Sequence, residues 1–252
     1  MTLRPQLAIR FTKGGKIPAF TLAEVLVTLG IIGVVAAMTL PMLAKNYQFY
    51  VRQQQFKKAY AAMSIAVQKT QIDLGEGVKC YYKNWADTSN RDITECPYFY
   101  EELLRNIRVV AKCEGDALEK HCLPKDFPDA AETYAKTQGG DNPQAAKEFF
   151  AQSCGSFVYS YLIRNADVYV FNDFIIIPNK VIQKAALLTI DINGHKGPNK
   201  WGHDMFLFQF LKQKKYDSVF NLVPSQICHP LDVGGYYTKD FFNYLYGQNA
   251  EL

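Results

Sequence analysis

The chain opens with a short basic stretch and becomes uniformly apolar from Phe20 to Ala44. These 25 residues contain a single charged side chain, Glu24. As a helix they extend about 38 Å at 1.5 Å per residue, which exceeds the roughly 30 Å hydrocarbon core of a bilayer. The pattern predicts a membrane-spanning helix over residues 20–44. Because a charge in lipid is costly, the acid near its start needs a partner or a function.

From residue 45 to residue 75 the apolar positions recur at helical spacing instead of continuously. Polar and basic side chains occupy the other faces, and Gly75 and Gly77 end the pattern. This predicts that the helix continues and lays an apolar stripe on a folded domain, as core packing and not as a cofactor site. The stripe consists of Phe56, Tyr60, Met63, Val67 and Leu74.

The region between residues 78 and 153 has a mixed pattern. Apolar residues at helical intervals predict a helix over Tyr98–Val110. A second helix is predicted over Gln144–Gln152, because Asp141-Asn142-Pro143 places capping side chains before a first-turn proline. The stretches around Pro124-Lys125-Asp126 and Gly139-Gly140 are expected to be loops.

After Gly155 the sequence favours strands. Runs rich in Val, Tyr, Phe and Ile, separated by short connections at 164–166 and 178–180, indicate antiparallel pairing. The expected fold class is therefore α+β, with a long helix packed against an antiparallel sheet. The aromatic segment Tyr236–Tyr246 either covers the sheet or forms a contact surface. The predicted strands are Ser156–Ile163, Asp167–Ile177, Ala186–Ile192 and Met205–Leu211.

The net charge of +4 belongs to the first 19 residues. They carry Arg4, Arg10, Lys13 and Lys16 and no acid, and without these four the 28 basic residues fall to 24, equal to the 24 acidic ones. Four positive charges before the helix favour a cytoplasmic N-terminus. Since the rest of the chain is formally neutral, its charge gives no reason to expect nucleic-acid binding.

All six cysteines follow the apolar helix, which suggests disulfides in an oxidising compartment. Six cysteines allow 15 pairings, of which Cys113–Cys122 and Cys80–Cys96 are plausible local pairs. Buried free thiols are the alternative, and zinc is disfavoured because no C-x2-C pair occurs. The cysteines are Cys80, Cys96, Cys113, Cys122, Cys154 and Cys228.

The start of the helix resembles the processing and assembly segment of type IV pilins and type II secretion pseudopilins. Their precursors carry a basic leader, a small residue, then Phe or Met followed by Thr-Leu-x-Glu and an apolar helix. Here the segment is Pro18-Ala19-Phe20-Thr21-Leu22-Ala23-Glu24, with Ala19 where the family usually has glycine. Pro41 falls where many members have a proline. A secretory signal peptide would have a shorter apolar run without an internal acid, whereas an ordinary signal anchor fits the hydropathy equally well.

This resemblance implies cleavage between Ala19 and Phe20 by a prepilin peptidase, then N-methylation of Phe20. The mature chain would insert in the inner membrane with its head in the periplasm or outside the cell. There Leu22, Glu24 and Pro41 would serve assembly with other pilin or pseudopilin subunits on an inner-membrane platform. The expected parts are a leader (1–19), a transmembrane helix (20–44), its amphipathic continuation (45–75) and a pilin-like head (76–252).

The expected function is that of a structural subunit, minor or specialised, of a type IV pilus or a type II secretion pseudopilus. A DNA-uptake filament is a further possibility within the same class. The alternative is a membrane-anchored extracytoplasmic binding module that does not polymerise. No enzyme is expected, because the four histidines are dispersed and no H-E-x-x-H, G-x-S-x-G or P-loop motif occurs.

The segment from Asp191 to Asp204 combines turn residues with oxygen-bearing side chains between two predicted strands. It resembles a D-x-N-G-x-x-G-P-N-x-x-G-x-D signature that recurs in prepilin-type heads. Calcium prefers carboxylate, amide and main-chain oxygens in flexible loops. The alternative is a tight connection capped by these side chains. No cofactor other than calcium is expected, and its candidate ligands are Asp191, Asn193, His195, Asn199 and Asp204.

Overall fold

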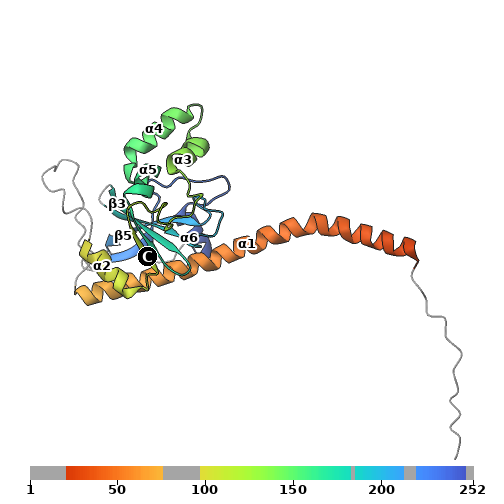
Figure 1. Cartoon of the computed structure of the whole chain (residues 1–252), viewed down its shortest axis with the longest axis horizontal. Coiled ribbons are helices and arrows are strands. Elements are labelled where there is room, and N and C mark those ends of the chain that lie inside the picture. The colour runs from red at the N-terminus through yellow and green to blue at the C-terminus, as the bar shows by residue number, and fades with distance from the viewer. Residues whose placement is uncertain (1–20, 76–96, 183–184, 213–219, 248–252) are drawn as a thin grey trace, which may run out of the picture. The chain divides into compact units, whose positions relative to one another are not determined.

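A computed structural model describes residues 21–75, 97–182, 185–212 and 220–247 (Figure 1). The chain divides into two compact units, Met1–Gln48 and Phe49–Leu252, and each is described by itself. The helices are α1 (Leu22–Leu74), α2 (Pro97–Asn106), α3 (Ala130–Gln138), α4 (Pro143–Ser153), α5 (Tyr159–Arg164) and α6 (Thr238–Tyr246), with a 3-10 turn at Gly155–Phe157.

The helix α1 is one uninterrupted element of 53 residues that continues through Pro41. Its first part belongs to the first unit and its last part, from Phe49, to the second. In the second unit the buried positions include Phe56, Met63 and Val67, members of the stripe expected from the sequence. The long N-terminal helix of the expected α+β class is therefore confirmed.

The second unit is built on a six-stranded antiparallel sheet. Its strand order follows the chain from β1 to β6, so each strand pairs with its neighbours in sequence. Antiparallel neighbours can be joined by short connections, but the connection from β1 to β2 contains α3, α4 and α5. The strands are β1 (Ala111–Glu114), β2 (Asp167–Val170), β3 (Ile175–Ile182), β4 (Ala185–Asp191), β5 (Met205–Lys212) and β6 (Phe220–Pro224).

Both faces of this sheet are buried. On one face Ile176, Leu188 and Phe208 join the core that contains Phe56 of α1. Side chains alternate along a strand, so their neighbours point to the other face, where Leu187 and others form a second core. This explains why the central strands β4 and β5 are almost continuously apolar instead of alternating with polar residues.

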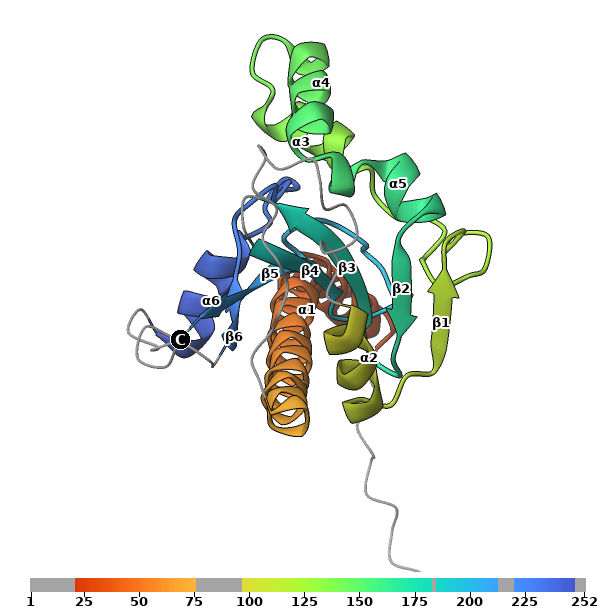
Figure 2. The same cartoon turned by 90° about the vertical axis from the view of Figure 1, so that its left-hand side faces the viewer.

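The helices form one layer on each face of the sheet, so that the second unit has three layers in all. Within the second unit α1 lies on one face, together with α2 and α6, whereas α3, α4 and α5 lie beyond the other face (Figure 2). The aromatic C-terminal segment forms α6, whose Phe241 and Phe242 are buried in the core shared with α1. Of the two roles considered for this segment, the buried pair shows that it covers the sheet.

Two disulfides hold the layer of α3 to α5. Cys113 of β1 pairs with Cys122, and Cys154 at the end of α4 pairs with Cys228. The first is one of the two local pairs considered from the sequence. The second, which joins residues 74 apart, could not be chosen from spacing. The other local pair, Cys80–Cys96, lies outside the described residues.

Three sequence predictions about the head are wrong. Residues Ser156–Ile163 form the 3-10 turn and α5 instead of a strand, although they are rich in aromatic and apolar residues. The connection expected at 178–180 lies inside β3. The single strand predicted over Asp167–Ile177 is the hairpin β2–β3, closed by a hydrogen bond from Phe171 N to the Phe174 carbonyl. Segment 156–163 is a place where tertiary context overrides local propensity. In the hairpin, Asn172-Asp173 is a local turn signal that was missed.

Candidate functional site

The first turn of α1 is closed by a reciprocal pair of side chains. The backbone N–H and the hydroxyl of Thr21 donate to Glu24 Oε2 at 2.9 and 2.8 Å, and Glu24 N–H donates to Thr21 Oγ1 at 3.3 Å. This is a capping box, which satisfies N–H groups that have no partner within the helix. Its Thr-x-x-Glu signal was present in the sequence and was missed. Glu24 therefore has a local partner in its own chain.

The apolar first part of α1 is exposed along its length. Leu26 is 61% exposed, Ile32 63% and Met38 74%, within a window whose mean hydropathy is 2.3. Among the described residues this is the one helix long and apolar enough to cross a membrane. A helix that is apolar on all sides requires lipid or other protein around it. Ala19 and Phe20, the expected processing site, lie outside the described residues.

The connection between β4 and β5 brings together the ends of the predicted cation loop. Asp191 is the last residue of β4 and pairs in register with Met205, the first residue of β5. The next residue, Ile192, donates its N–H to the Asp204 carbonyl at 2.8 Å. Strand pairing therefore places two carboxylates, 13 positions apart in the sequence, side by side.

Backbone and amide N–H groups surround these two carboxylates. Asp191 Oδ1 accepts from Asn193 N and Gly194 N at 3.1 and 3.0 Å. Asp204 Oδ2 accepts from Asn199 N at 2.7 Å and from Asn193 Nδ2 at 3.2 Å, and its Oδ1 accepts from Lys200 N at 2.6 Å. The N–H groups of the loop thus bind its own two carboxylates. A tight connection capped by these side chains, the alternative considered from the sequence, would show the same hydrogen bonds.

Three buried oxygens of this cluster have no hydrogen-bond partner: Asp191 Oδ2, Asn193 Oδ1 and Asn199 Oδ1. The three residues are only 1%, 8% and 3% exposed. Leaving such a group unsatisfied costs about 1–3 kcal/mol, and more when it is charged. A capped turn does not by itself supply partners for these oxygens, whereas a bound cation or a buried water would.

The electrostatics of the cluster are unfavourable for two ionised acids. Burial raises the pKa of Asp191 well above its ordinary value, and the nearby charge of Asp204 raises it further. Burial also raises the pKa of Asp204, although the N–H groups of Lys200 and Asn199 act in the opposite direction. Like charges in a low-dielectric site resist joint ionisation unless a positive charge is present.

The structure changes the set of residues around the loop. His195 is exposed, and its ring Nε2 contacts the His121 carbonyl at 2.9 Å. Asp126, which the sequence placed in a loop without a role, accepts from Asn199 Nδ2 at 2.5 Å. Nothing in the local sequence joins Asp126 to Asn199, because the two are 73 residues apart.

The far end of the loop is fixed by a close backbone approach. Trp201 is fully buried, and its backbone N–H donates to Asp232 Oδ2 at 2.9 Å. The backbone N–H of Tyr236 donates to the Gly202 carbonyl at 2.8 Å. Gly202 has φ +77°, and a Cβ there would lie 2.7 Å from the Tyr236 carbonyl oxygen. Only glycine fits this contact, which holds the loop rigidly beside segment 231–236.

The remaining histidines do not form a reaction centre with one another. His203 Nδ1 accepts from Arg52 of α1 at 2.7 Å, and its Nε2 donates to the Val233 carbonyl at 3.1 Å. His229 is buried beside Tyr237 and Thr238. In the described parts of the chain no three His, Cys, Asp or Glu side chains form a metal-binding group. Calcium also accepts amide and main-chain oxygens, and Asn193 and Asn199 supply the amides of this loop.

No family model, curated protein or solved structure matches the chain.

Proposed function

We propose that this chain is a membrane-anchored structural subunit of a type IV pilus or type II secretion pseudopilus. It is cleaved between Ala19 and Phe20 and polymerises through the first part of α1. The observation that carries the proposal is the exposed apolar surface of that helix, which starts at a Thr-Leu-x-Glu segment. Lipid covers this surface before assembly, and neighbouring subunits cover it afterwards.

The orientation follows from charge and from cysteine chemistry. The basic residues before α1 favour the cytoplasmic side for the N-terminus. The two disulfides of the head persist only in an oxidising compartment, outside the cytoplasm. Both arguments support a head in the periplasm or at the cell surface. The prepilin peptidase and the assembly platform of the inner membrane are the partners that this proposal expects.

Glu24 has two roles in this proposal. Within its own chain it caps α1 through Thr21. After cleavage it also pairs with the new α-amine of Phe20 from a neighbouring subunit. In a filament core such a pair is shielded from water, and removing one partner of a buried ion pair costs about 3–5 kcal/mol.

Two substitutions at Glu24 separate these roles. Glu24→Gln keeps a capping box, because Gln also serves at this position, but removes the charge. Glu24→Ala removes both. We expect both variants to insert in the membrane and to be lost from sheared filaments, measured by fractionation. Incorporation of Glu24→Gln at the wild-type level would reduce Glu24 to a cap and contradict the ion pair.

The N-terminus of the mature protein distinguishes the proposal from its alternative. Mass spectrometry of the membrane fraction is expected to find N-methylated Phe20 as the first residue. An intact Met1 would instead indicate an anchored binding module that does not polymerise. Ala19→Gly serves as a control, because glycine is the usual residue of the family and should be cleaved at least as well.

A second function, calcium binding by the 191–204 loop, is favoured by the three buried oxygens without partners. With calcium at about 100 times its Kd the head gains about 2.7 kcal/mol, or about 5–10 °C in Tm for a domain of this size. Asp191→Asn is expected to remove this gain while keeping an acceptor oxygen for the turn. An unchanged wild-type Tm in millimolar calcium, relative to EDTA, would contradict calcium binding.

A further inference from the structure

We propose that Asp126 is a ligand of the same cation, so that binding fastens the segment between β1 and α3 to the β4–β5 loop. This inference rests on the proposed calcium binding and adds a ligand and a consequence to it. The site would be assembled from two parts of the chain, residues 123–129 and residues 191–204. The first part leads into the helices α3 and α4, and the second connects the strands β4 and β5.

Asp126 reaches the cluster directly. Its Oδ1 accepts from Asn199 Nδ2 at 2.5 Å. Asn199 connects Asp126 to the Asp191–Asp204 pair, because its backbone N–H donates to Asp204 Oδ2 at 2.7 Å. Among the described residues none of these three acids forms an ion pair with a lysine or arginine. A divalent cation beside Asn199 would offset part of their negative charge.

The unpartnered oxygens lie in the same region. Asn199 is 3% exposed and its Oδ1 has no partner, although the Nδ2 of the same amide contacts Asp126. Asn193 repeats the pattern, with Nδ2 on Asp204 and Oδ1 without a partner. For one cation to take both Asp126 and Asn199 as oxygen ligands, the Asn199 amide would have to turn by half, so that Oδ1 replaces Nδ2 beside the Asp126 carboxylate.

This donor set suits calcium better than magnesium. It consists of carboxylates and neutral amide oxygens on irregular backbone, including Asn199 at φ +50°. Calcium takes six to eight oxygens in flexible geometry, whereas magnesium requires a near-ideal octahedron and retains water. The ligand class is therefore a hard divalent cation of the size of calcium.

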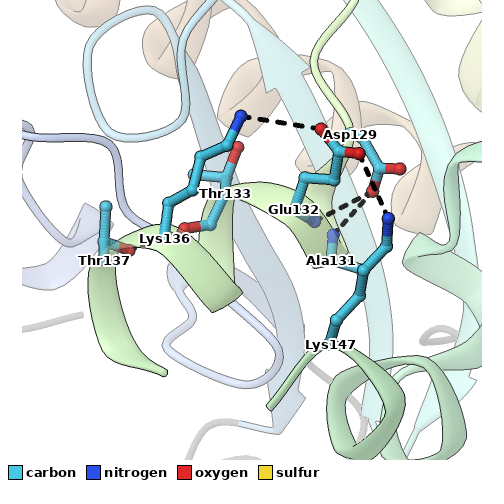
Figure 3. A network of polar contacts seen from close by, with 7 residues as sticks. All are labelled: Asp129, Ala131, Glu132, Thr133, Lys136, Thr137 and Lys147. Carbon is cyan, nitrogen blue, oxygen red and sulfur yellow. Dashed lines mark hydrogen bonds and ion pairs between the residues drawn. The ribbon is translucent and has the colours of Figure 1, made fainter. Parts of the chain in front are cut away.

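The segment that carries Asp126 is internally braced. Its first part is closed by the Cys113–Cys122 disulfide. Asp129 caps α3 by accepting from Ala131 N and Glu132 N, and Lys147 of α4 reaches Glu132 at 3.1 Å (Figure 3). Because these links join the loop before α3 to the two helices, fixing Asp126 would restrain the whole segment. Cation binding at Asp126 therefore reduces the opening of the whole loop before α3.

A second contact links the same two loops. The ring Nε2 of His195 lies 2.9 Å from the His121 carbonyl, five residues before Asp126. This contact is exposed to solvent, so it orients the loops and adds little to the strength of their association. The cation would supply the stronger link, because it involves charged ligands from both sides.

The test uses the full chain in detergent micelles, with calcium titrated by calorimetry and amide exchange followed by mass spectrometry. Asp126→Asn is expected to weaken calcium binding by at least about tenfold, because it removes one charged ligand. In the wild type calcium slows exchange in both 117–127 and 193–200. In Asp126→Asn it slows exchange only in 193–200.

The matched control is Asp129→Asn, which removes a carboxylate three residues away and keeps the helix cap, since Asn caps as well as Asp. Its calcium affinity is expected to equal that of the wild type. Equal affinity of Asp126→Asn and Asp129→Asn, with calcium bound, would overturn the role of Asp126 and leave the calcium site intact. Absence of any calcium heat in the wild type would overturn both.

Discussion

At the residue scale, His229 is a buried base outside the candidate cation site. It is 4% exposed, its ring stacks edge-on to Tyr237 at 5.5 Å, and its Nδ1 lies 3.5 Å from Thr238 Oγ1. Its Nε2 has no hydrogen-bond partner. Because burial disfavours the charged ring, the pKa of His229 falls from 6.5 to about 3. The fold therefore holds this histidine neutral.

Acid should destabilise the head through His229. The pKa is lowered on folding, so the stability it contributes is complete above about pH 6.5 and is lost as the pH falls toward 3. Between pH 7 and pH 5 the loss is about 2 kcal/mol. Denaturant midpoints of His229→Gln are expected to fall less over this range than those of the wild type. His121→Asn, at an exposed site, should follow the wild type, and an equally steep fall in His229→Gln would contradict the assignment.

At the element scale, the last part of α1 is the central helix of the head. Phe56 is fully buried and packs against the rings of Phe206, Phe208 and Phe241, with centroid distances of 4.9, 5.8 and 5.1 Å. Aromatic pairs at these distances contribute beyond their buried area. One side chain of α1 thus contacts both the sheet and α6.

Substitutions on two faces of α1 should differ strongly. Phe56→Ala opens a cavity beneath the helix and is expected to lower the free energy of unfolding by about 3–5 kcal/mol. Ile65→Ala, at a side chain that is 66% exposed, should change it by less than about 0.5 kcal/mol. Urea denaturation of the two variants in the same detergent measures the difference. Similar losses would show that the stripe does not anchor the helix.

At the scale of the whole molecule, α1 serves two environments. From Leu22 onward it presents apolar side chains that no other described residue of its own unit covers, and beyond Phe49 it presents a stripe that the head buries. The change of pattern near residue 45 is therefore a change of surroundings along one helix. This division matches a subunit that is held in a membrane by one part and folded outside it by the other.

Much of the fold could be predicted because it follows from local periodicity. The stripe of α1, the cap of α4 by Asn142 and Pro143, and the strands β4 and β5 all have signals within a few residues. Other local signals were present and were missed, namely the Thr-x-x-Glu cap of α1 and Asp129 before α3. Segment 156–163 is apolar enough for a strand, but it forms the 3-10 turn and α5, with Phe157 and Leu162 in the core on the second face of the sheet.

The sequence by itself determined the apolar helix, its amphipathic continuation and the oxygen-rich loop 191–204, because each of them has a signal in residues that are close together in the chain. Only the tertiary structure decided which distant groups meet: Cys154 with Cys228, and Asp126 with Asn199. Such contacts depend on how the layers stack on the sheet, which no local pattern encodes. The folded loop also shows buried oxygens without partners. Because of that observation, the 191–204 loop is a candidate cation site and not only a connection between strands.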